Sequence, residues 1–242
     1  MKIQVLFALS TVLAGVLSGA AICTVYAQGG QVREIGQAPT AQSSDTAATV
    51  VFITITEPGK YRLITNLNGG GRPFVISIES SNVTLDLNGF SITGGNDAIR
   101  ATGSNIAIFN GSINPGDGYG ISGGANCRVE KLRIGGGRDG MSLGPNCIVK
   151  DNTVQAAHAG ILCFGGCVIS GNTVSTNSEV AIGATNSSLV VGNTATSTGN
   201  IALVADDTTG YAQNVLHGNQ ADVSGGVQIG GNLCVTSKIC QP

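Results

Sequence analysis

The sequence contains few charged and few aromatic residues. Asp, Glu, Lys and Arg make up 11% of the 242 residues, aromatic residues make up 4%, and tryptophan is absent. Long amphipathic helices need a polar face rich in Glu, Lys and Arg, so this composition argues against a helical protein. The formal net charge of −2 gives no electrostatic basis for binding nucleic acid or an anionic membrane surface, and we predict neither partner.

Glycine, by contrast, is abundant, with 37 residues, and 42% of the chain is hydrophobic. Short apolar segments separated by many tight turns are typical of all-β proteins. We therefore expect a chain built of short strands.

The N-terminal residues 1–27 are predicted to be a signal peptide. Lys2 supplies a positive charge, an apolar run covers residues 3–23, and small residues precede a cleavage site after Ala27. An uncleaved membrane anchor is the alternative, because the run is almost long enough to span a bilayer. We expect a secreted or periplasmic protein that has no membrane contact once the signal is removed.

A small residue followed by an aliphatic residue recurs along the chain. The aliphatic members, spaced by 22, 20, 20, 21, 21 and 24 residues, are Ile99, Ile121, Met141, Ile161, Ile182, Leu203 and Val227. A second column lies 11 residues after each of the first six and comprises Asn110, Leu132, Asn152, Asn172, Asn193 and Asn214, with Asn88 one repeat earlier. A period of about 21 residues is typical of proteins whose repeats pack on their neighbours.

Apolar residues alternate between the two columns, as in Val83-Leu85-Leu87 and Ile106-Ile108. Alternation with a period of two indicates strands with one buried face, and the repeats lack the leucines of a leucine-rich repeat. Three short strands and three turns fill a coil of this length, so we predict a parallel β-helix. The asparagines are expected to bond turn backbone of their own or a neighbouring coil and to adopt left-handed geometry.

The segments ISIESSNVTLDLNGFSITGG and SNIAIFNGSI, with the repeated GNTV, resemble the pectate-lyase-like superfamily over about residues 61–235. The resemblance implies an all-β, right-handed, single-stranded parallel β-helix, here of about eight coils. This superfamily includes lyases, hydrolases, epimerases, adhesins and phage spikes, so the resemblance implies a fold without one activity.

Three regions follow from this fold. Residues 28–48 are polar and aperiodic and are predicted to be a flexible leader. Residues 49–242 form the predicted β-helix domain, in which about 49–74 should cap one end and a cysteine-containing tail should protect the other. Caps are expected because the ends of a solenoid expose unpaired strands.

Six cysteines besides Cys23 lie in this domain, and export permits disulfides. Cys127, Cys147 and Cys167 are 20 residues apart, which places them at one position of three successive coils. The Cα atoms in neighbouring coils are then about 4.8 Å apart, within the range of a disulfide. Our preferred pairing is Cys127–Cys147, Cys163–Cys167 and Cys234–Cys240. The alternative is a stack of buried free thiols.

The reactive side chains concentrate in the half of each repeat whose length varies. The candidate catalytic residues are Asp117, Arg138, Asp139 and His158, and the candidate substrate-binding residues are Arg100, Tyr119 and Glu179. A lyase or epimerase needs a cation for the uronate carboxylate and a base for the C5 proton, for which Arg138 or Arg100 and His158 are available. A hydrolase needs two carboxylates, here Asp117 and Asp139. The structural alternative is that Asp and Gly only form turns.

Sequence motifs of the catalytic relatives are absent. The chain has no N-T-D, G-H-G or D-P-H-D segment, and its acidic residues are sparse compared with the Ca²⁺ sites of pectate lyases. We predict no metal and no cofactor. Tyr119 is the one aromatic residue placed to stack on a sugar, whereas Phe164 is expected in the core.

These observations favour an exported β-helix protein that binds polysaccharide or another surface partner without catalysis. The alternative is a polysaccharide lyase, C5-epimerase or glycoside hydrolase that acts on acidic polysaccharide at the edge formed by Asp117, Arg138, Asp139 and His158.

Overall fold

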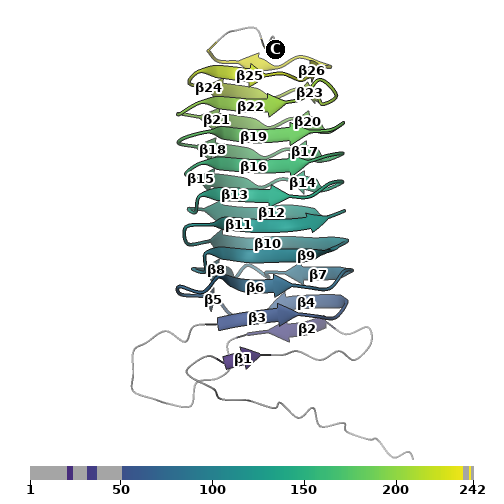
Figure 1. The fold of residues 1–242 in the computed structure, drawn as a ribbon, viewed down its shortest axis with the longest axis vertical. Helices are drawn as coiled ribbons and strands as arrows, with labels where there is room; N and C mark the ends of the chain where they lie inside the picture. The colour runs from purple at the N-terminus through teal and green to yellow at the C-terminus, as the bar shows by residue number, and fades with distance from the viewer. Residues whose placement is uncertain (1–20, 24–31, 37–50, 237–239, 241–242) are drawn as a thin grey trace, which may run out of the picture.

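The computed structural model describes residues 21–23, 32–36, 51–236 and 240. Within these ranges the chain contains no helix, and parallel strands stack into a β-helix of about nine turns with a spacing of ~21 residues. Figure 1 shows the coils stacked along one axis from the N-terminal to the C-terminal end. The predicted parallel β-helix is confirmed, with about one turn more than the eight expected.

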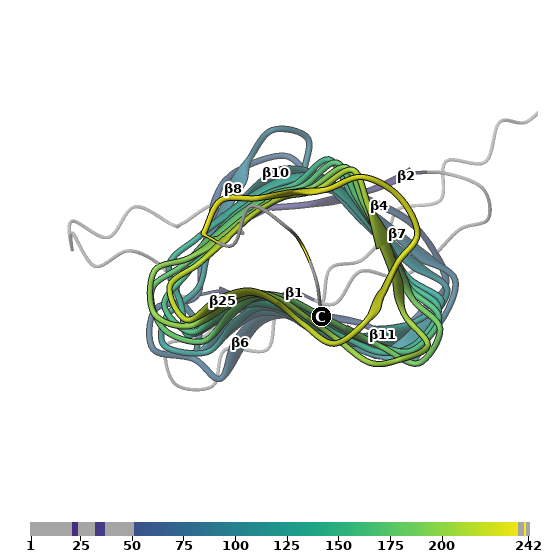
Figure 2. The same ribbon diagram turned by 90° about the horizontal axis from the view of Figure 1, so that it is seen from above.

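Each coil contributes to three parallel ladders, here called faces A, B and C, which enclose the interior seen in Figure 2. Face A comprises β1 (Ala21–Cys23), β3 (Val51–Ile55), β6 (Phe74–Ile78), β9 (Asp97–Ser104), β11 (Tyr119–Ala125), β13 (Asp139–Leu143), β16 (Ala159–Phe164), β19 (Val180–Thr185), β22 (Ile201–Ala205) and β25 (Ala221–Ser224). Face B comprises β2 (Val32–Ile35), β4 (Gly59–Leu63), β7 (Val83–Asp86), β10 (Ile106–Asn114), β12 (Arg128–Gly135), β14 (Ile148–Lys150), β17 (Val168–Ser170), β20 (Leu189–Val191), β23 (Gly210–Ala212) and β26 (Val227–Gln228). Face C comprises β5 (Leu67–Asn68), β8 (Ser91–Thr93), β15 (Thr153–Ala156), β18 (Thr173–Thr176), β21 (Thr194–Ser197), β24 (Val215–Gly218) and β27 (Leu233–Cys234), and the long strands β10 and β12 extend into it.

Stacks of aliphatic side chains fill the interior because equivalent residues of successive coils lie one strand spacing apart. The inward stack of face A is Ile53, Ile76, Ile99, Ile121, Met141, Ile161, Ile182, Leu203 and Val223, all of them buried. The sequence had suggested Val227 as the last member, and this was wrong. Gly225 and Gly226 adopt positive φ in a turn, so Val227 begins β26 on face B and is 46% exposed.

The N-terminal part of the domain is more regular than expected. Residues 51–68 form β3, β4 and β5, which pair in register with β6, β7 and β8, so the predicted cap (about 49–74) is largely a complete coil. This coil accounts for the additional turn.

Within the predicted leader, residues 32–35 differ from the expectation because they form β2, which pairs with β4. Ile35 is aligned with the inward-facing Leu63 and is fully buried. Burial of this side chain stabilises β2, although the surrounding residues in the sequence are polar. β1 lies inside the predicted signal peptide and pairs with β3. Apart from Gly36, the rest of the signal peptide and leader lies outside the described residues.

A ladder of buried asparagines runs through the interior and consists of Asn152, Asn172, Asn193 and Asn214. At each step the Oδ1 atom of one asparagine accepts hydrogen bonds from the backbone N–H and Nδ2 of the asparagine one coil earlier, at 2.9–3.0 Å. The Nδ2 atom of each also donates to a carbonyl of the preceding coil, as from Asn172 to Val149 at 2.9 Å. Leu132 N–H and Asn232 Oδ1 end the ladder. Because these side-chain amides are hydrogen-bonded, burying them does not leave polar groups unsatisfied at a cost in free energy.

Asn88 and Asn110 do not belong to this ladder, which corrects the column read from the sequence. Both are exposed and have positive φ, at 51° and 66°. The strand register aligns Leu132 with Gly111 instead of Asn110, because a register shift between Gly123 and Ala125 changes the spacing by one residue. A shift of one residue moves a side chain to the opposite side of the coil wall.

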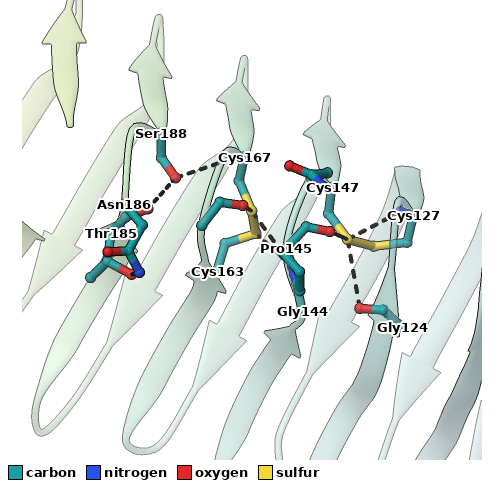
Figure 3. The surroundings of a disulfide bond; sticks show 12 residues. Gly124, Cys127, Gly144, Pro145, Cys147, Cys163, Cys167, Thr185, Asn186 and Ser188 are labelled. Carbon is teal, nitrogen blue, oxygen red and sulfur yellow. Dashed lines mark hydrogen bonds between the residues drawn. A yellow bond between two sulfur atoms is a disulfide. The ribbon is translucent and has the colours of Figure 1, made fainter. Parts of the chain in front are cut away.

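Within the described residues three disulfides are present, in the pairing that we preferred: Cys127–Cys147, Cys163–Cys167 and Cys234–Cys240. Cys127, Cys147 and Cys167 occupy equivalent places in successive coils, and the first two Cα atoms are 4.4 Å apart (Figure 3). Ser188 follows in the next coil, where its Oγ accepts a hydrogen bond from Cys167 N–H (3.0 Å) and donates to Thr185 O. This stack therefore connects two coils by one disulfide, Cys127–Cys147, and two later coils by the hydrogen bond between Cys167 and Ser188.

The C-terminal tail is attached to the last coils by side chains as well as by backbone. Cys234 and Cys240 are both buried, and the hydroxyl of the buried Tyr211 donates a 3.1 Å hydrogen bond to the carbonyl of Cys240. Burial raises the pKa of Tyr211. The disulfide to Cys234 and the hydrogen bond from Tyr211 hold Cys240 against the last coils.

Candidate functional site

The candidate residues lie at the edge where each coil enters face A, at the beginning of β11, β13, β16 and β19. This edge lies on the left in Figure 1. In one of these turns Gly136 and Gly137 adopt φ of 82° and 71°, which glycine tolerates without strain, and the chain then places Arg138 outside and Asp139 at the start of β13. Register aligns Tyr119 with Asp139, so side chains of successive coils meet along this edge.

Asp139 is the centre of a hydrogen-bonded cluster. Its side chain is 3% exposed, yet both carboxylate oxygens are paired. Oδ2 accepts hydrogen bonds from Arg138 Nε (3.1 Å) and Nη2 (2.9 Å). Oδ1 accepts one from the backbone N–H of Ala159 (3.0 Å) and lies 3.2 Å from His158 Nδ1. A buried carboxylate is tolerated here because the Arg138 cation and two further groups, Ala159 N–H and the His158 ring, take the place of its hydrating water.

His158 lies between the carboxylate of Asp139 and that of Glu179 in the next coil. Its Nδ1 faces Asp139, and its Nε2 lies 2.9 Å from Glu179 Oε1. A neutral imidazole carries one N–H and can donate to only one of these carboxylates, whereas the protonated ring donates to both. The ring is therefore held in one orientation while a third of its surface stays open to solvent, with 37% of the side chain exposed.

Arg138 extends the cluster in the opposite direction. Its Nη2 donates to the Tyr119 hydroxyl at 2.7 Å, and its Cζ atom lies 5.2 Å from the centre of the Tyr119 ring. The hydrogen bond and charge of Asp139 raise the pKa of Arg138 above its ordinary value. Tyr119, Arg138, Asp139, His158 and Glu179 thus form one continuous row across four coils, here called the polar row.

Two predicted site residues lie outside the polar row. Asp117 is exposed and makes no side-chain hydrogen bond or ion pair with any described residue; with Arg138 it lines a shallow depression of about 310 Å³. Arg100 points outward from the middle of face A, where its Cζ lies 5.7 Å from the Phe74 ring. The structure therefore brings five of the seven candidates together, and the catalytic or binding role of each stays a prediction.

Asp97 is a structural counterpart of Asp139. Its Oδ1 accepts the backbone N–H of Tyr119 (3.0 Å), just as Asp139 Oδ1 accepts that of Ala159, and its Oδ2 accepts the Ser122 hydroxyl (3.0 Å). An aspartate at this place thus stabilises the start of a strand, which is the turn-forming role considered from the sequence.

An apolar hollow on face A was missed from the sequence. It has a volume of about 280 Å³, adjoins Glu179, and is lined by Leu162, Phe164, Val180, Gly183, Ile201 and Val204 together with neighbouring residues. The prediction that Phe164 packs in the core is wrong, because its side chain is 52% exposed. The signal in the sequence was available: the outward column of face A reads Ser122, Ser142, Leu162, Gly183, Val204 and Ser224, so aliphatic residues replace serine at two coils.

Pectate lyases bind Ca²⁺, but the side chains at this edge are not arranged to bind this ion. Both oxygens of Asp139 are already engaged, and Glu179 faces His158. Across the part of the chain that the structure describes, no group of three or more His, Cys, Asp or Glu side chains is placed to hold a metal ion. In the same ranges, no helix is long and apolar enough to cross a membrane.

No protein-family model matches the sequence, and the curated proteins contain no significant match. Among solved structures, the crystal structure of the Dettilon tailspike protein matches with a TM-score of 0.34 and 14% sequence identity. The match covers 89% of this chain and 61% of that chain, so this protein spans less than two thirds of the tailspike's length.

Proposed function

We propose that this protein binds polysaccharide at the polar row without catalysing its cleavage. The observation that carries the proposal is the row itself. Arg138, His158 and Glu179 are each at least one third exposed, and they follow one another along the helix axis at intervals of about one strand spacing. An extended sugar chain presents hydroxyl and carboxylate groups in a line, which is the arrangement that such a row can bind.

The pairing within the row favours binding over catalysis. Asp139 cannot serve as one of two hydrolytic carboxylates, because it is buried and both its oxygens are occupied. The charge of Arg138 is already balanced by Asp139, which weakens its action on a substrate anion. The depression beside Asp117 is shallow and open, so it does not exclude the water that catalytic electrostatics must displace.

One observation favours acid–base catalysis as the second candidate. His158 is oriented by a buried carboxylate and has a partly exposed ring, which is the usual arrangement of a general base. In this reading the substrate displaces Glu179 from His158 Nε2, after which His158 or Tyr119 removes the C5 proton of a uronate residue in a lyase or C5-epimerase and Arg138 contacts the sugar carboxylate.

We further propose that the protein is secreted or periplasmic. Three disulfides support this placement, since such bonds persist in oxidising compartments, and the N-terminal signal pattern agrees with it.

Affinity gel electrophoresis with pectate, alginate, glycosaminoglycans and neutral glucans tests the binding proposal. We expect retarded migration with at least one polymer, lost in Arg138→Ala and His158→Ala and kept in Thr173→Ala, a matched exposed residue on face C. Absence of retardation with every polymer would contradict binding. In parallel, ultraviolet absorbance, reducing ends and C5 proton exchange are measured; turnover that disappears in His158→Ala would establish the second candidate instead.

A further inference from the structure

The apolar hollow on face A exists because one side chain is missing from a column of larger ones. Gly183 lies between Leu162 and Val204 in the strand register of β16, β19 and β22, which are neighbours in Figure 1. A Cβ atom at Gly183 would lie 2.8 Å from Leu162 Cδ2, so Leu162 already leans over the space that the glycine leaves.

The walls of the hollow are apolar in a place where other coils are polar. Phe164 is 52% exposed, and Leu162 and Val204 replace the serines found at the same position in β11 and β13. Apolar side chains left in water raise the free energy of the uncovered state relative to one in which a ligand covers them, so such a patch is typical of a binding site.

Hydrogen-bond acceptors border this apolar space. Glu179 is 55% exposed and belongs to both the hollow and the polar row. Asn200 also lines the hollow, and its Oδ1 atom is shielded from solvent and has no hydrogen-bond partner among the residues that the structure describes. An unpaired buried acceptor costs free energy, which a ligand that supplies an N–H or O–H donor recovers.

We infer that the hollow is a subsite for the N-acetyl group of an amino sugar within the polysaccharide bound at the polar row. The methyl group fills the space above Gly183, and the sugar ring lies against Phe164. The amide N–H donates to Glu179 or, after rotation about the soft terminal torsion of Asn200, to its Oδ1 atom. This assignment rests on the proposed function, because the shared residue Glu179 makes the hollow continuous with the polar row.

A plain neutral hexose fits this site less well. It lacks the methyl group that covers the apolar walls and places a hydroxyl there instead. A ligand that lacks one methyl-sized group in an apolar pocket binds about tenfold more weakly, or weaker still.

Titrations followed by protein NMR, with N-acetylglucosamine and glucose as probes, test the inference. We expect saturable shifts of the Gly183, Ile201 and Leu162 amides with N-acetylglucosamine, and binding at least about tenfold weaker for glucose. Equal affinity for the two sugars, or shifts confined to other coils, would overturn the inference. This comparison uses the unmodified protein, so it does not depend on a variant folding.

Variants then locate the site. Gly183→Val fills the hollow and is expected to abolish the preference for the N-acetyl sugar. Asn200→Ala should reduce this preference without abolishing it. Ser142→Val is the matched control, because it adds the same side chain to the same outward column two coils earlier and should change neither affinity. If a polysaccharide retards the protein in gels but the preference for the N-acetyl sugar is absent, this inference fails alone. If no polysaccharide retards the protein, the proposed function fails.

Discussion

The two halves of the β-helix use different means to bind one coil to the next. In the coils up to and including that of Leu132 no asparagine ladder is present among the described residues, and the longest strands occur there, with nine residues in β10 and eight in β9 and β12. In the coils after Leu132 an asparagine ladder runs beside the aliphatic stacks, and no strand is longer than six residues among those described.

The spacing of the coils differs in the same way. Aligned inward residues of face A are 23 and 22 residues apart from Ile76 to Ile121, and 20 or 21 apart from Ile121 to Val223. The ladder constrains its own positions, because hydrogen bonds are directional and each amide must meet the next one. An aliphatic stack accepts bulges and insertions, because hydrophobic contacts lack direction.

Removal of a ladder amide should have the largest effect. Asn172→Ala removes bonds to Asn152, Asn193 and Val149 and leaves buried groups unpaired, so we expect a loss of about 3 kcal/mol in the free energy of unfolding. Urea denaturation followed by circular dichroism measures this change.

The control is Asn110→Gly in the other half. Asn110 is exposed with φ of 66°, a conformation that glycine adopts readily, so the expected change is within about 0.5 kcal/mol. Similar losses in the two variants would remove the distinction between the halves.

The two internal disulfides should contribute unequally. Cys127–Cys147 joins a coil of the first half to the ladder half and has a sequence separation of 20, whereas that of Cys163–Cys167 is four. Loop entropy predicts a loss of about 3 kcal/mol for the Cys127→Ala/Cys147→Ala pair and about 2 kcal/mol for Cys163→Ala/Cys167→Ala. Denaturant midpoints of both double variants test this order, and a reversed order would show that local packing, not loop length, decides the contribution.

The smallest effect concerns the turn after β22. Asp206 accepts hydrogen bonds from the backbone N–H of Asn186 and from the hydroxyl groups of Thr209 and Thr208, which lowers its pKa from 3.8 to about 2. Since the folded state binds the proton more weakly than the unfolded state, Asp206 stabilises the fold above about pH 4, and this contribution is lost as the pH falls towards 2.

Melting temperatures of the wild type and Asp206→Asn should therefore differ slightly at pH 6 and converge near pH 2. Asp207→Asn, one residue along the same turn, is the control and should show no such convergence. A difference between wild type and Asp206→Asn that persists unchanged at pH 2 would show that the charge is not the stabilising feature.

Much of this architecture could be predicted from residue patterns. Met141 was placed in the core because it occupies the position of isoleucine in other repeats, and it is fully buried. The cysteine stack followed from the equal spacing of Cys127, Cys147 and Cys167. These predictions succeeded because each depends only on the repeat period.

Three predictions failed where the direction of a side chain mattered. Asn110 was placed in the ladder, Val227 in the core and Phe164 inside the coil, yet all three are exposed or outward-facing. A single bulge or a two-glycine turn changes which side of the wall a residue faces, and the sequence does not reveal such a shift.

The sequence by itself determined a parallel β-helix, its period and the residues that stack in it, because these follow from alternation and repetition. The repeat phase also predicted that Arg138, Asp139, His158 and Glu179 share one edge. Only the tertiary structure decided which of these side chains bond to one another, that Tyr119 joins them, and that the carboxylate at the centre is buried. The physical reason is that burial and pairing across coils depend on the register of neighbouring coils, which is set by the packing of the whole stack.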